Sequence, residues 1–497
     1  MFSRRERDII EERKKYRKTG PEESGLLIPV ERWFVDMSVV GAYIMPHPPI
    51  VVPSVGKGEE KRIEKTVQAY RKAARGIAEL KPETIVVTSP HAVLYADYLH
   101  IAPGKSASGD LHQFGSADPP VTFPYDTDFV TALTVETGKE HIPAGTFGER
   151  DPSVDHGTLV PLTYVNEAYR DYKLVRCSIS GLDPLTHYNF GRCIARAAEK
   201  LNRRTVLVAS GDLSHKLRED GPYGFAEEGP QFDREVTEAM KKADFLRFLT
   251  FDPEFCDAAA ECGLRSFMIL AGVFDGIAVD PEFLSYEGPF GVGYAVCGFH
   301  PKGPDKSRCF APKYLEWKHQ AMEKRRKGED LYVRLARMSL ESWIKNGRRP
   351  AVPDDLPPDL TKRRAGVFVS LHKNGSLRGC IGTILPVQGS VADEILRNAI
   401  SAGQHDPRFD PVREEELPDL VYSVDVLSTP EPIASMNELN PKKYGVIVRK
   451  GDRCGLLLPD LAGVDTPSQQ VDIALQKAGI RRDEQFRMER FEVVRHT

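Results

Sequence analysis

Several features are missing from this chain of 497 residues, and each absence argues against a class of protein. Its eight cysteines include no CxxC pair, which argues against a disulfide framework or a zinc ribbon and is typical of reduced thiols in a cytosol. No run approaches the roughly 20 apolar residues of a membrane helix, and the charged N-terminus lacks the apolar core of a signal peptide. We therefore expect a cytoplasmic protein that is neither exported nor inserted in a membrane.

An excess of charge of one sign is also missing. Lys and Arg number 68 and Asp and Glu number 72, so the net charge of −4 does not point to nucleic acid or to an anionic membrane. A P-loop signature is absent, and nothing suggests a nucleotide. The hydrophobic share of 41% and the charged share of 28% are those of an ordinary globular protein. Because the chain is longer than a single core usually supports, we expect two domains.

The first domain is expected at residues 38–300, after an N-terminal extension at 1–37. Short β-branched runs alternate there with longer amphipathic stretches, which is typical of βαβ units. We predict an α/β fold with a mainly parallel sheet and flanking helices. The expected strands are Val39–Ile44, Thr84–Thr88, Lys173–Ser178, Thr205–Ala209 and Val292–Cys297, and the expected helices are Glu59–Leu80, Phe190–Leu201 and Cys256–Phe274.

A segment rich in Pro, Gly and charge at residues 301–313 is the predicted linker to a second domain at 314–497. This domain opens with a long helical pattern, Tyr314–Asn346, and then mixes strands irregularly with helices, which indicates an α+β fold. The turn at Asn374 and Gly375 predicts a hairpin, because Asn-Gly accepts positive φ angles. Further expected elements are strands at Val367–Leu371, Leu420–Leu427, Tyr444–Arg449 and Gly455–Leu458, and helices at Val391–Ala402 and Ser468–Ala478.

Three histidines follow three strands of the predicted parallel sheet. His47 stands in MPHPPI, His91 in TSPH and His215 in SGDLSH. Ligands of open α/β sheets bind outside the carboxyl ends of the strands, so three imidazoles at such ends predict one site, although any one of them alone can be a surface histidine. Because neutral imidazole is the commonest metal ligand among side chains, His47 and His91 are the first two candidate metal ligands.

The third ligand is open between two neighbours in the segment AAECGLRSF. Glu261 would complete a set of two histidines and one carboxylate, which leaves positions for a substrate and oxygen on Fe(II). The thiolate of Cys262 would be a softer ligand, suited to Zn or Cu. Both residues are expected in the early turns of a buried helix, where the macrodipole also favours a glutamate and a cysteine can be an inert thiol.

His215 is the expected general acid/base, because an unperturbed pKa near 6.5 lets an imidazole pass protons at neutral pH. Asp212 lies beside it in GDLSH and is included in the candidate catalytic group. His156, in the DHG that precedes an apolar LVPL run, is expected to orient a substrate or to hydrogen bond to the metal ligands. For Asp155 the alternative is a cap of the following helix.

These motifs, PHPP with His47, SPH with His91, DHG with His156 and GDLSH with His215, resemble the LigB-type, class III extradiol dioxygenases and the related Memo-like proteins over about residues 38–300. The dioxygenase resemblance implies Fe(II) held by two histidines and a glutamate, which only Glu261 could supply. It further implies a catechol-like substrate, His215 as acid/base and a homodimer.

Memo-like proteins instead have a CG pair, which Cys262 and Gly263 match. That match implies a metal-binding or interaction protein without ring cleavage, or a non-redox Zn enzyme on the same histidines. Fe(II) is the metal expected first, with Zn or Cu as the alternatives.

In the second domain the hexapeptide LRGCIG places Cys380 among glycines, next to Arg378, which would lower the thiol pKa or bind an anion. A structural cysteine is the other interpretation. His405 belongs to a second polar cluster, HDPRF, and the three residues form a candidate second site. LRGCIG, HDPRFDPV and YSVDVLSTPEPI resemble the AMME syndrome candidate protein family, from about residue 314 to the C-terminus. The fusion resembles a microbial arrangement associated with a radical SAM protein, which implies such a partner.

Overall fold

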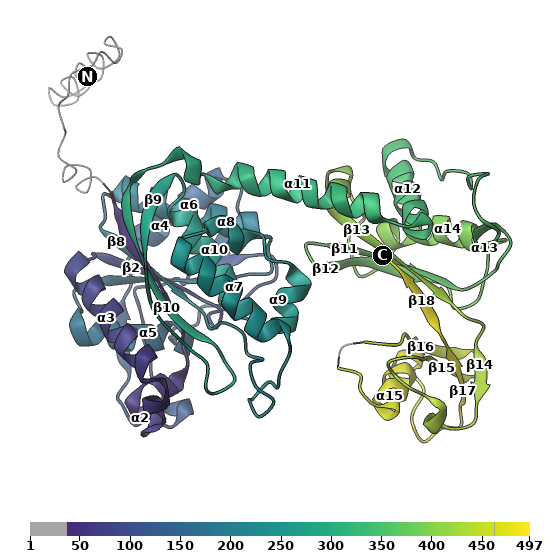
Figure 1. Cartoon of the computed structure of the whole chain (residues 1–497), viewed down its shortest axis with the longest axis horizontal. Coiled ribbons are helices and arrows are strands. Elements are labelled where there is room, and N and C mark those ends of the chain that lie inside the picture. Colours follow the sequence, from purple (N-terminus) through teal and green to yellow (C-terminus); the bar gives the residue numbers. More distant parts are fainter. Residues whose placement is uncertain (1–36, 462) are drawn as a thin grey trace, which may run out of the picture. The chain divides into compact units, whose positions relative to one another are not determined.

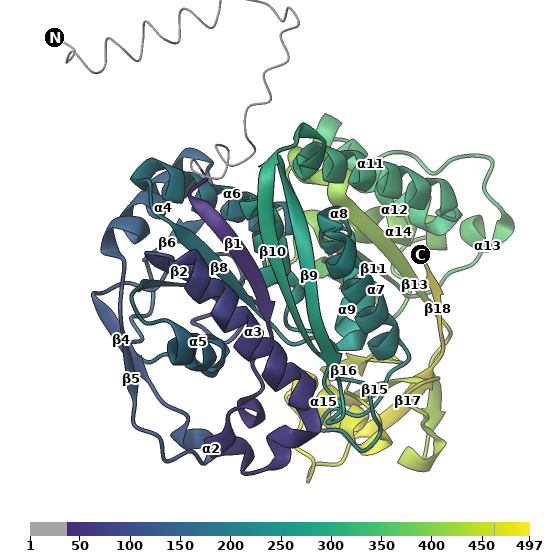
Figure 2. The same ribbon diagram turned by 60° about the vertical axis from the view of Figure 1, so that its left-hand side comes forward.

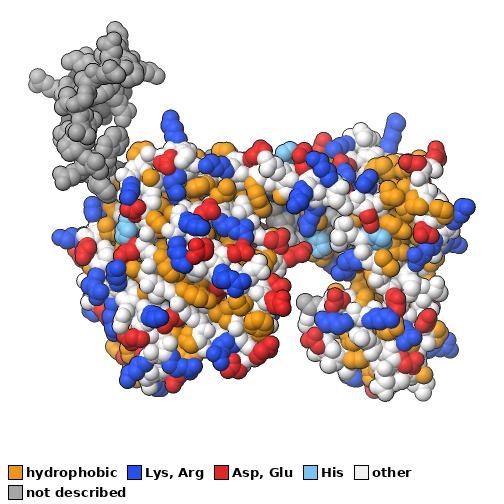
Figure 3. Space-filling view, in the orientation of Figure 1, with side chains coloured by type: hydrophobic (Ala, Val, Ile, Leu, Met, Phe, Trp, Pro, Cys, Tyr) orange, Lys and Arg blue, Asp and Glu red, His pale blue; other side chains and the backbone are white. Residues whose placement is uncertain are grey.

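The computed structural model describes residues 37–461 and 463–497, so the predicted N-terminal extension lies outside the described residues except for Met37. The chain divides into two compact units, one of residues up to 249 with 258–311, the other of residues 250–257 with 312–497 (Figure 1). Acidic and basic side chains are interspersed on the visible face of each unit (Figure 3). Within the described ranges, no helix is long and apolar enough to cross a membrane.

The first unit is built on a six-stranded sheet of order β7-β2-β8-β1-β10-β9. The first four of these strands run parallel, and β10 and β9 add an antiparallel edge, so the predicted α/β fold with a mainly parallel sheet is confirmed. β2 and β8 are buried along their whole length, which explains their continuous apolar runs. The strands are β1 (Val39–Met45), β2 (Thr84–Ser89), β7 (Lys173–Ser178), β8 (Thr205–Ser210), β9 (Ile277–Glu287) and β10 (Tyr294–Pro304).

Helices cover both faces of this sheet. α3 (Glu64–Leu80) and α5 (His156–Ala168) lie together on one face, in front of the strands in Figure 2. α6 (Pro184–Leu201) and α10 (Leu264–Val273) pack on the other. The smaller elements are η2 (Pro49–Val51), α2 (Pro53–Gly56), η3 (Glu59–Ile63), β3 (Leu99–His100), β4 (Ser106–Gly109), η4 (His112–Phe114), β5 (Val121–Pro124), α4 (Thr127–Lys139), β6 (Ala144–Gly145), α7 (Glu228–Lys242), α8 (Phe245–Leu249) and η5 (Lys306–Arg308). Helix α9 (Pro253–Ala259) belongs to the second unit as far as residue 257.

The single helix predicted over Cys256–Phe274 is wrong, because the chain bends between α9 and α10. Ala260 has a φ of 54°, in the left-handed region that ends a helix. The Glu261 carboxylate then accepts a hydrogen bond from the Leu264 amide at 2.7 Å, which satisfies a free N–H at the start of α10. Glu261 and Cys262 therefore lie in a bend between two helices.

The segment predicted as an irregular linker, residues 301–313, contains regular structure. β10 pairs with β9 as far as Pro304, and α11 (Phe310–Gly328) begins after η5. A β-ladder is held by main-chain hydrogen bonds, which require no apolar alternation, so the Pro- and Gly-rich composition concealed the end of this strand.

The long helix predicted over Tyr314–Asn346 is wrong in its continuity, since it divides into α11 and α12 (Leu331–Asn346). Asp330 separates them, because its carboxylate accepts hydrogen bonds from the amides of Tyr332 and Val333 and so caps the second helix.

The second unit contains two four-stranded antiparallel sheets, of order β12-β11-β13-β18 and β14-β17-β15-β16. Helices α12 and α14 pack on the first sheet and α15 on the second, so the α+β prediction is confirmed. Asn374 and Gly375, with φ of 52° and 80°, form the predicted hairpin turn. The elements are α13 (Pro358–Thr361), β11 (Val367–Lys373), β12 (Ser376–Gly382), α14 (Val391–Gln404), η6 (Glu414–Asp419), β13 (Leu420–Leu427), β14 (Glu431–Ile433), η7 (Met436–Glu438), β15 (Gly445–Lys450), β16 (Arg453–Leu457), α15 (Pro467–Ala478), β17 (Arg487–Phe491) and β18 (Val493–His496).

Candidate metal centre

The carboxyl ends of three neighbouring parallel strands meet at one edge of the first sheet. His47, His91 and His215 follow β1, β2 and β8 there, and His156 is the first residue of α5. The ligand atoms of His47, His91 and His156 lie within 4.8 Å of one another. This edge therefore presents a cluster of three imidazoles that can hold a metal ion.

The imidazoles of His47 and His91 converge, as the strand endings predict. Their Nε2 atoms are 3.0 Å apart, and the ring planes are nearly perpendicular, at 88°. Two nitrogens that each lie about 2.1 Å from one ion, at a right angle, would be about 3.0 Å apart, so this geometry fits two ligands of one ion. The ring of His156 lies 4.0 Å from that of His91, between centroids.

The hydrogen bond of His47 Nδ1 directs the lone pair of its Nε2 into the cluster, where His91 Nε2 lies 3.0 Å away and Cys262 Sγ lies 3.6 Å away. Ser210 Oγ donates its proton to the carbonyl of Gly157 at 2.5 Å, so the same oxygen accepts the proton of His47 Nδ1 at 2.9 Å. This arrangement selects the tautomer with the lone pair on Nε2. The backbone N–H of His47 donates to Asp212 Oδ1 at 2.8 Å, which fixes the position of the loop.

Asp155 joins the loop of His91 to the start of α5. Its carboxylate accepts hydrogen bonds from the Ser89 hydroxyl at 2.5 Å and from the Thr158 amide at 3.0 Å, so the alternative interpretation as a helix cap is confirmed. The Ser89 oxygen in turn accepts from the His91 amide at 3.1 Å. A Cβ at Gly157 would lie 2.3 Å from Ser89 Oγ, so only glycine permits this approach.

Desolvation favours the neutral form of the imidazoles in this cluster, of which His47 is buried, His156 is half-buried and His91 is exposed. Desolvation lowers the pKa of His47 well below its ordinary value of 6.5, and the neighbouring histidines lower it further. Desolvation also lowers the pKa of His91, and it lowers those of His156 and His215 to about 4. Since neutral imidazole is the form that binds metals, the cluster is prepared for a cation at neutral pH.

The Cys262 thiol lies close to His47, whereas the Glu261 carboxylate accepts a hydrogen bond from the amide of Leu264, the first residue of α10. The Cys262 sulfur is 3.6 Å from His47 Nε2 and 3.3 Å from the amide of Asp212. Burial raises the pKa of the Cys262 thiol, and the carboxylates of Asp212 and Glu261 add to this effect. Of the two residues that the sequence left open, the thiol is the one directed at the imidazole cluster.

Two glycines allow the loops of Asp212 and Cys262 to touch. A Cβ at Gly211 would lie 2.1 Å from the Cα of Gly263, so the two backbones are in contact where neither has a side chain. The GDLSH and ECG motifs therefore form one structural unit around His47.

His215 stands beside the cluster with its Nε2 buried and, among the described residues, without a hydrogen-bond partner. Its amide donates to the carbonyl of Ala259 at 3.2 Å, which also accepts the Ser214 hydroxyl at 2.8 Å. A buried nitrogen without a partner is energetically unfavourable, so Nε2 is available to accept a hydrogen bond from a molecule in the site.

Asp233 of α7 holds the loop of His215, and no sequence pattern indicated it. The side chain is 1% exposed and accepts hydrogen bonds from the Ser214 amide at 2.8 Å and the Tyr286 hydroxyl at 2.7 Å. Burial raises the pKa of Asp233 to about 7, and it does the same for Asp212.

His156 was expected only to orient a substrate or support the ligands, and its position in the cluster was missed because it follows no strand.

The three residues of the candidate second site make separate contacts in the second unit. Arg378 forms a two-pronged ion pair with Glu416, at 3.0 Å for both hydrogen bonds. The Cys380 sulfur accepts a hydrogen bond from the Ser370 hydroxyl at 3.2 Å. His405 is exposed at the C-terminal end of α14.

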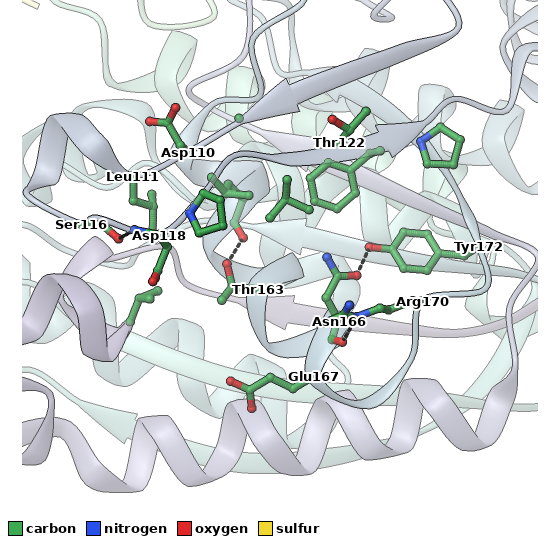
Figure 4. Close-up of a pocket in the computed structure, with 17 residues that line it drawn as sticks. Asp110, Leu111, Ser116, Asp118, Thr122, Thr163, Asn166, Glu167, Arg170 and Tyr172 are labelled. Carbon is green, nitrogen blue, oxygen red and sulfur yellow. Dashed lines mark hydrogen bonds between the residues drawn. The ribbon is translucent and has the colours of Figure 1, made fainter.

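A separate pocket of about 430 Å³ lies along α5 (Figure 4). Thr163 and Asn166, from later turns of α5, line it together with residues of β5, and the Tyr172 hydroxyl donates to Asn166 Oδ1 at 2.9 Å. These residues lie about two to three helical turns beyond His156, so the pocket is distinct from the imidazole cluster.

Residues 41–297 match the family described as the catalytic LigB subunit of aromatic ring-opening dioxygenase, and residues 333–496 match the AMMECR1 family. Protein CA_C1420 of Clostridium acetobutylicum is 42% identical over 469 residues, which cover 93% of this chain and 99% of that protein. A Thermotoga maritima protein is 52% identical over 171 residues, 34% of this chain and 98% of its own length. The crystal structure of protein PH0010 from Pyrococcus horikoshii has 32% identity and a TM-score of 0.32, with coverage of 34% and 89%. Both resemblances that the motifs predict are confirmed, and the chain belongs to the LigB family, with an AMMECR1 domain in its C-terminal part.

Proposed function

We propose that the first unit is a metal-dependent oxidoreductase of the extradiol type, which acts with Fe(II) and oxygen on a catechol-like small molecule. The observation that carries this proposal is the convergence of His47 and His91, 3.0 Å apart at Nε2, beside the unpaired buried Nε2 of His215. Membership in the LigB family supports a metal-dependent site of this kind.

The donor set fits a first-row metal ion. Imidazole nitrogen suits Fe, Zn and Cu, and the lone pair of His47 Nε2 is kept available by the Ser210 hydrogen bond. His47 and His91 would hold the ion together with His156 or Cys262. Fe(II) bound there would supply the redox chemistry with oxygen that imidazoles and carboxylates alone do not provide.

His215 is the residue that we expect to move the substrate proton. Its Nε2 has no partner within the part of the chain that the structure describes, so a hydroxyl of the substrate can donate to it, and the imidazole is neutral at pH 7 because desolvation lowers its pKa to about 4. Asp212, with its carboxylate 3.8 Å from His47 Nε2 and its pKa raised to about 7 by burial, is the second group able to exchange a proton.

The proposal is tested by oxygen uptake. Metal-free full-length protein is loaded anaerobically with Fe(II) and mixed with oxygen and a series of catechols. We expect Fe(II)-dependent uptake that is lost in His47→Ala and in His215→Asn and retained in His141→Asn, which changes an exposed histidine. Absence of metal-dependent uptake with every diol would overturn the dioxygenase proposal.

The position of Cys262 favours a second candidate, a Memo-like metal-binding protein or a non-redox Zn enzyme. A thiolate is a ligand that Zn prefers, and this sulfur is 3.6 Å from His47 Nε2. Protein loaded with Co(II) in place of Zn would show a thiolate-to-metal absorption band that Cys262→Ser removes and Glu261→Gln retains. The opposite pattern, or a band unaffected by either change, would exclude the thiolate as a ligand.

A further inference from the structure

An aromatic side chain lies over the imidazole that we assign as the proton carrier. The rings of Tyr223 and His215 are 5.0 Å apart between centroids and tilted by 32°. Tyr223 is 59% exposed, whereas the Nε2 of His215 is buried. Tyr223 therefore stands at the surface and covers one side of a ring that belongs to the candidate site.

The loop that carries Tyr223 is fixed at its base. Leu217 and Phe225 form an isolated β-bridge, and the amide of Ala226 donates to the carbonyl of Lys216 at 3.2 Å. These contacts bring the two ends of residues 217–225 together, so this segment forms a closed loop between β8 and α7. A rotation of the Tyr223 side chain therefore need not disturb the strand or the helix on either side.

The tip of the loop has room on one side only. A Cβ at Gly221 would lie 3.1 Å from the Cα of Gly291, so this end packs closely against the turn between β9 and β10. Gly224, on the other side of Tyr223, has a φ of 75° and no heavy atom within 4 Å of a Cβ placed there. The amide of Gly224 donates to the carbonyl of Gly221 at 3.3 Å, so the two glycines close a turn, and the movement open to Tyr223 is rotation of its side chain about this fixed turn.

Nε2 of His215 would gain a hydrogen bond if Tyr223 moved aside and a ligand entered. Among the described residues His215 Nε2 is buried and has no hydrogen-bond partner, which is unfavourable for a polar atom, and the Tyr223 ring lies against the same imidazole. A ligand hydroxyl that reaches Nε2 would supply the missing partner. In the ligand-free protein the Tyr223 ring therefore lies against His215, and a ligand that donates a hydrogen bond to Nε2 would give this nitrogen its partner.

We propose that Tyr223 is the gate of the site: its ring covers His215 in the ligand-free protein and moves aside when a hydroxyl-bearing ligand pairs with Nε2. The assignment of that ligand rests on the proposed function. The cover itself rests only on the contact between the two rings and on the loop.

The test measures how fast His215 reacts with diethyl pyrocarbonate, which modifies neutral imidazoles, in the metal-free full-length protein. Peptide mass spectrometry gives the rate at each histidine, and the exposed His112 and His141 serve as internal references. We expect Tyr223→Ala to raise the His215 rate several-fold and Tyr223→Phe, which keeps the ring, to leave it unchanged. The reference rates should be the same in all variants.

Phe147→Ala is the matched control, since it removes an aromatic side chain that is 84% exposed on another segment of the same unit, and it should leave the His215 rate unchanged. If all histidines react faster in Tyr223→Ala, the fold has loosened, and the comparison passes to Tyr223→Leu, which removes only part of the cover. Equal His215 rates in wild type and in the folded variant overturn the gate. The labelling uses neither metal nor turnover, so it can fail while the oxygen-uptake experiment succeeds, and the reverse.

Discussion

Gly157 is the residue at which the lack of a side chain lets two parts of the metal centre meet. A Cβ there would lie 2.3 Å from Ser89 Oγ and 3.3 Å from His91 Cδ2, so Gly157→Ala must move the Ser89 hydroxyl, which accepts a hydrogen bond from the His91 amide and thereby holds the loop of His91. Because loss of a contact that orients a ligand typically weakens metal binding by 10- to 100-fold, we expect a decrease of about that size. Competition titration of Zn or Co(II) against a chelator measures it.

The matched control for this variant is Gly138→Ala in α4. Gly138 has no heavy atom within 4 Å of a Cβ placed there, so the alanine should leave metal affinity unchanged. Equal affinity in the Gly157 and Gly138 variants would show that the close approach at His91 is not needed for binding.

Asp233 gives a prediction about pH. Its pKa in the folded protein is about 7, against an ordinary 3.8, so the native state favours the protonated carboxyl. The stability from that preference is fully present below pH 3.8 and is lost as the pH rises through 7. Asp233→Asn keeps an acceptor for the Ser214 amide and has no proton to lose.

Between pH 4 and pH 8 the free energy of unfolding of Asp233→Asn should therefore rise relative to wild type, by on the order of 3 to 4 kcal/mol, at about 1.4 kcal/mol per pKa unit. Urea unfolding of both proteins across this range, followed by hydrogen exchange in α7, measures the difference. A constant difference would mean that the carboxyl titrates equally in the folded and unfolded chain.

At the level of single residues, the sequence indicated the histidines that follow strands and missed the groups that hold them. His47, His91 and His215 have a local signal, because each comes shortly after a buried β-branched run. Asp233 has none, since its partners Ser214 and Tyr286 come from other elements and only the fold brings them together.

Among the elements, α6 and α10 depend on glycine for their contact. A Cβ at Gly272 of α10 would lie 1.8 Å from the carbonyl oxygen of Tyr188 in α6, and one at Gly191 of α6 would lie 2.0 Å from that of Ile269. Overpacking at such a contact typically destabilises a protein by about 1 to 3 kcal/mol. Because the added methyl group of Gly272→Ala would clash with backbone rather than with a side chain, we expect a loss of stability at the upper end of this range.

Urea unfolding followed by hydrogen exchange in α6 and α10 tests this expectation. Gly138→Ala again provides the control, because alanine at an open helical position is neutral or stabilising by up to about 1 kcal/mol. Equal stability of the two variants would show that the helices can separate without loss.

The strands and most helices were predictable from periodicity, whereas two helix breaks were not. Ala260 adopts a left-handed φ of 54°, although alanine is a strong helix former and gives no local warning of a bend. At Asp330 a capping side chain was visible in the sequence, but helical periodicity continued on both sides and suggested a single long helix. Tertiary contacts decide such breaks, so they are the least predictable part of the fold.

For the whole molecule, the fusion of two families raises the question of how many metal ions one chain holds. Within residues 37–461 and 463–497, the group of side chains able to hold an ion is His47, His91 and His156, all in the first unit. Cys380 of the second unit has a hydroxyl neighbour, Ser370, rather than a set of metal donors. Among the described residues, the group able to hold an ion therefore belongs to the LigB unit.

We accordingly expect one equivalent of tightly bound metal per chain after saturation and desalting, measured by elemental analysis of the full-length protein. His91→Ala should strongly reduce the metal content, because it removes one of the two imidazoles whose Nε2 atoms converge to 3.0 Å. Cys380→Ala should retain the full equivalent. Two equivalents in the wild type, with one of them lost in Cys380→Ala, would contradict this assignment and place a second centre in the AMMECR1 domain.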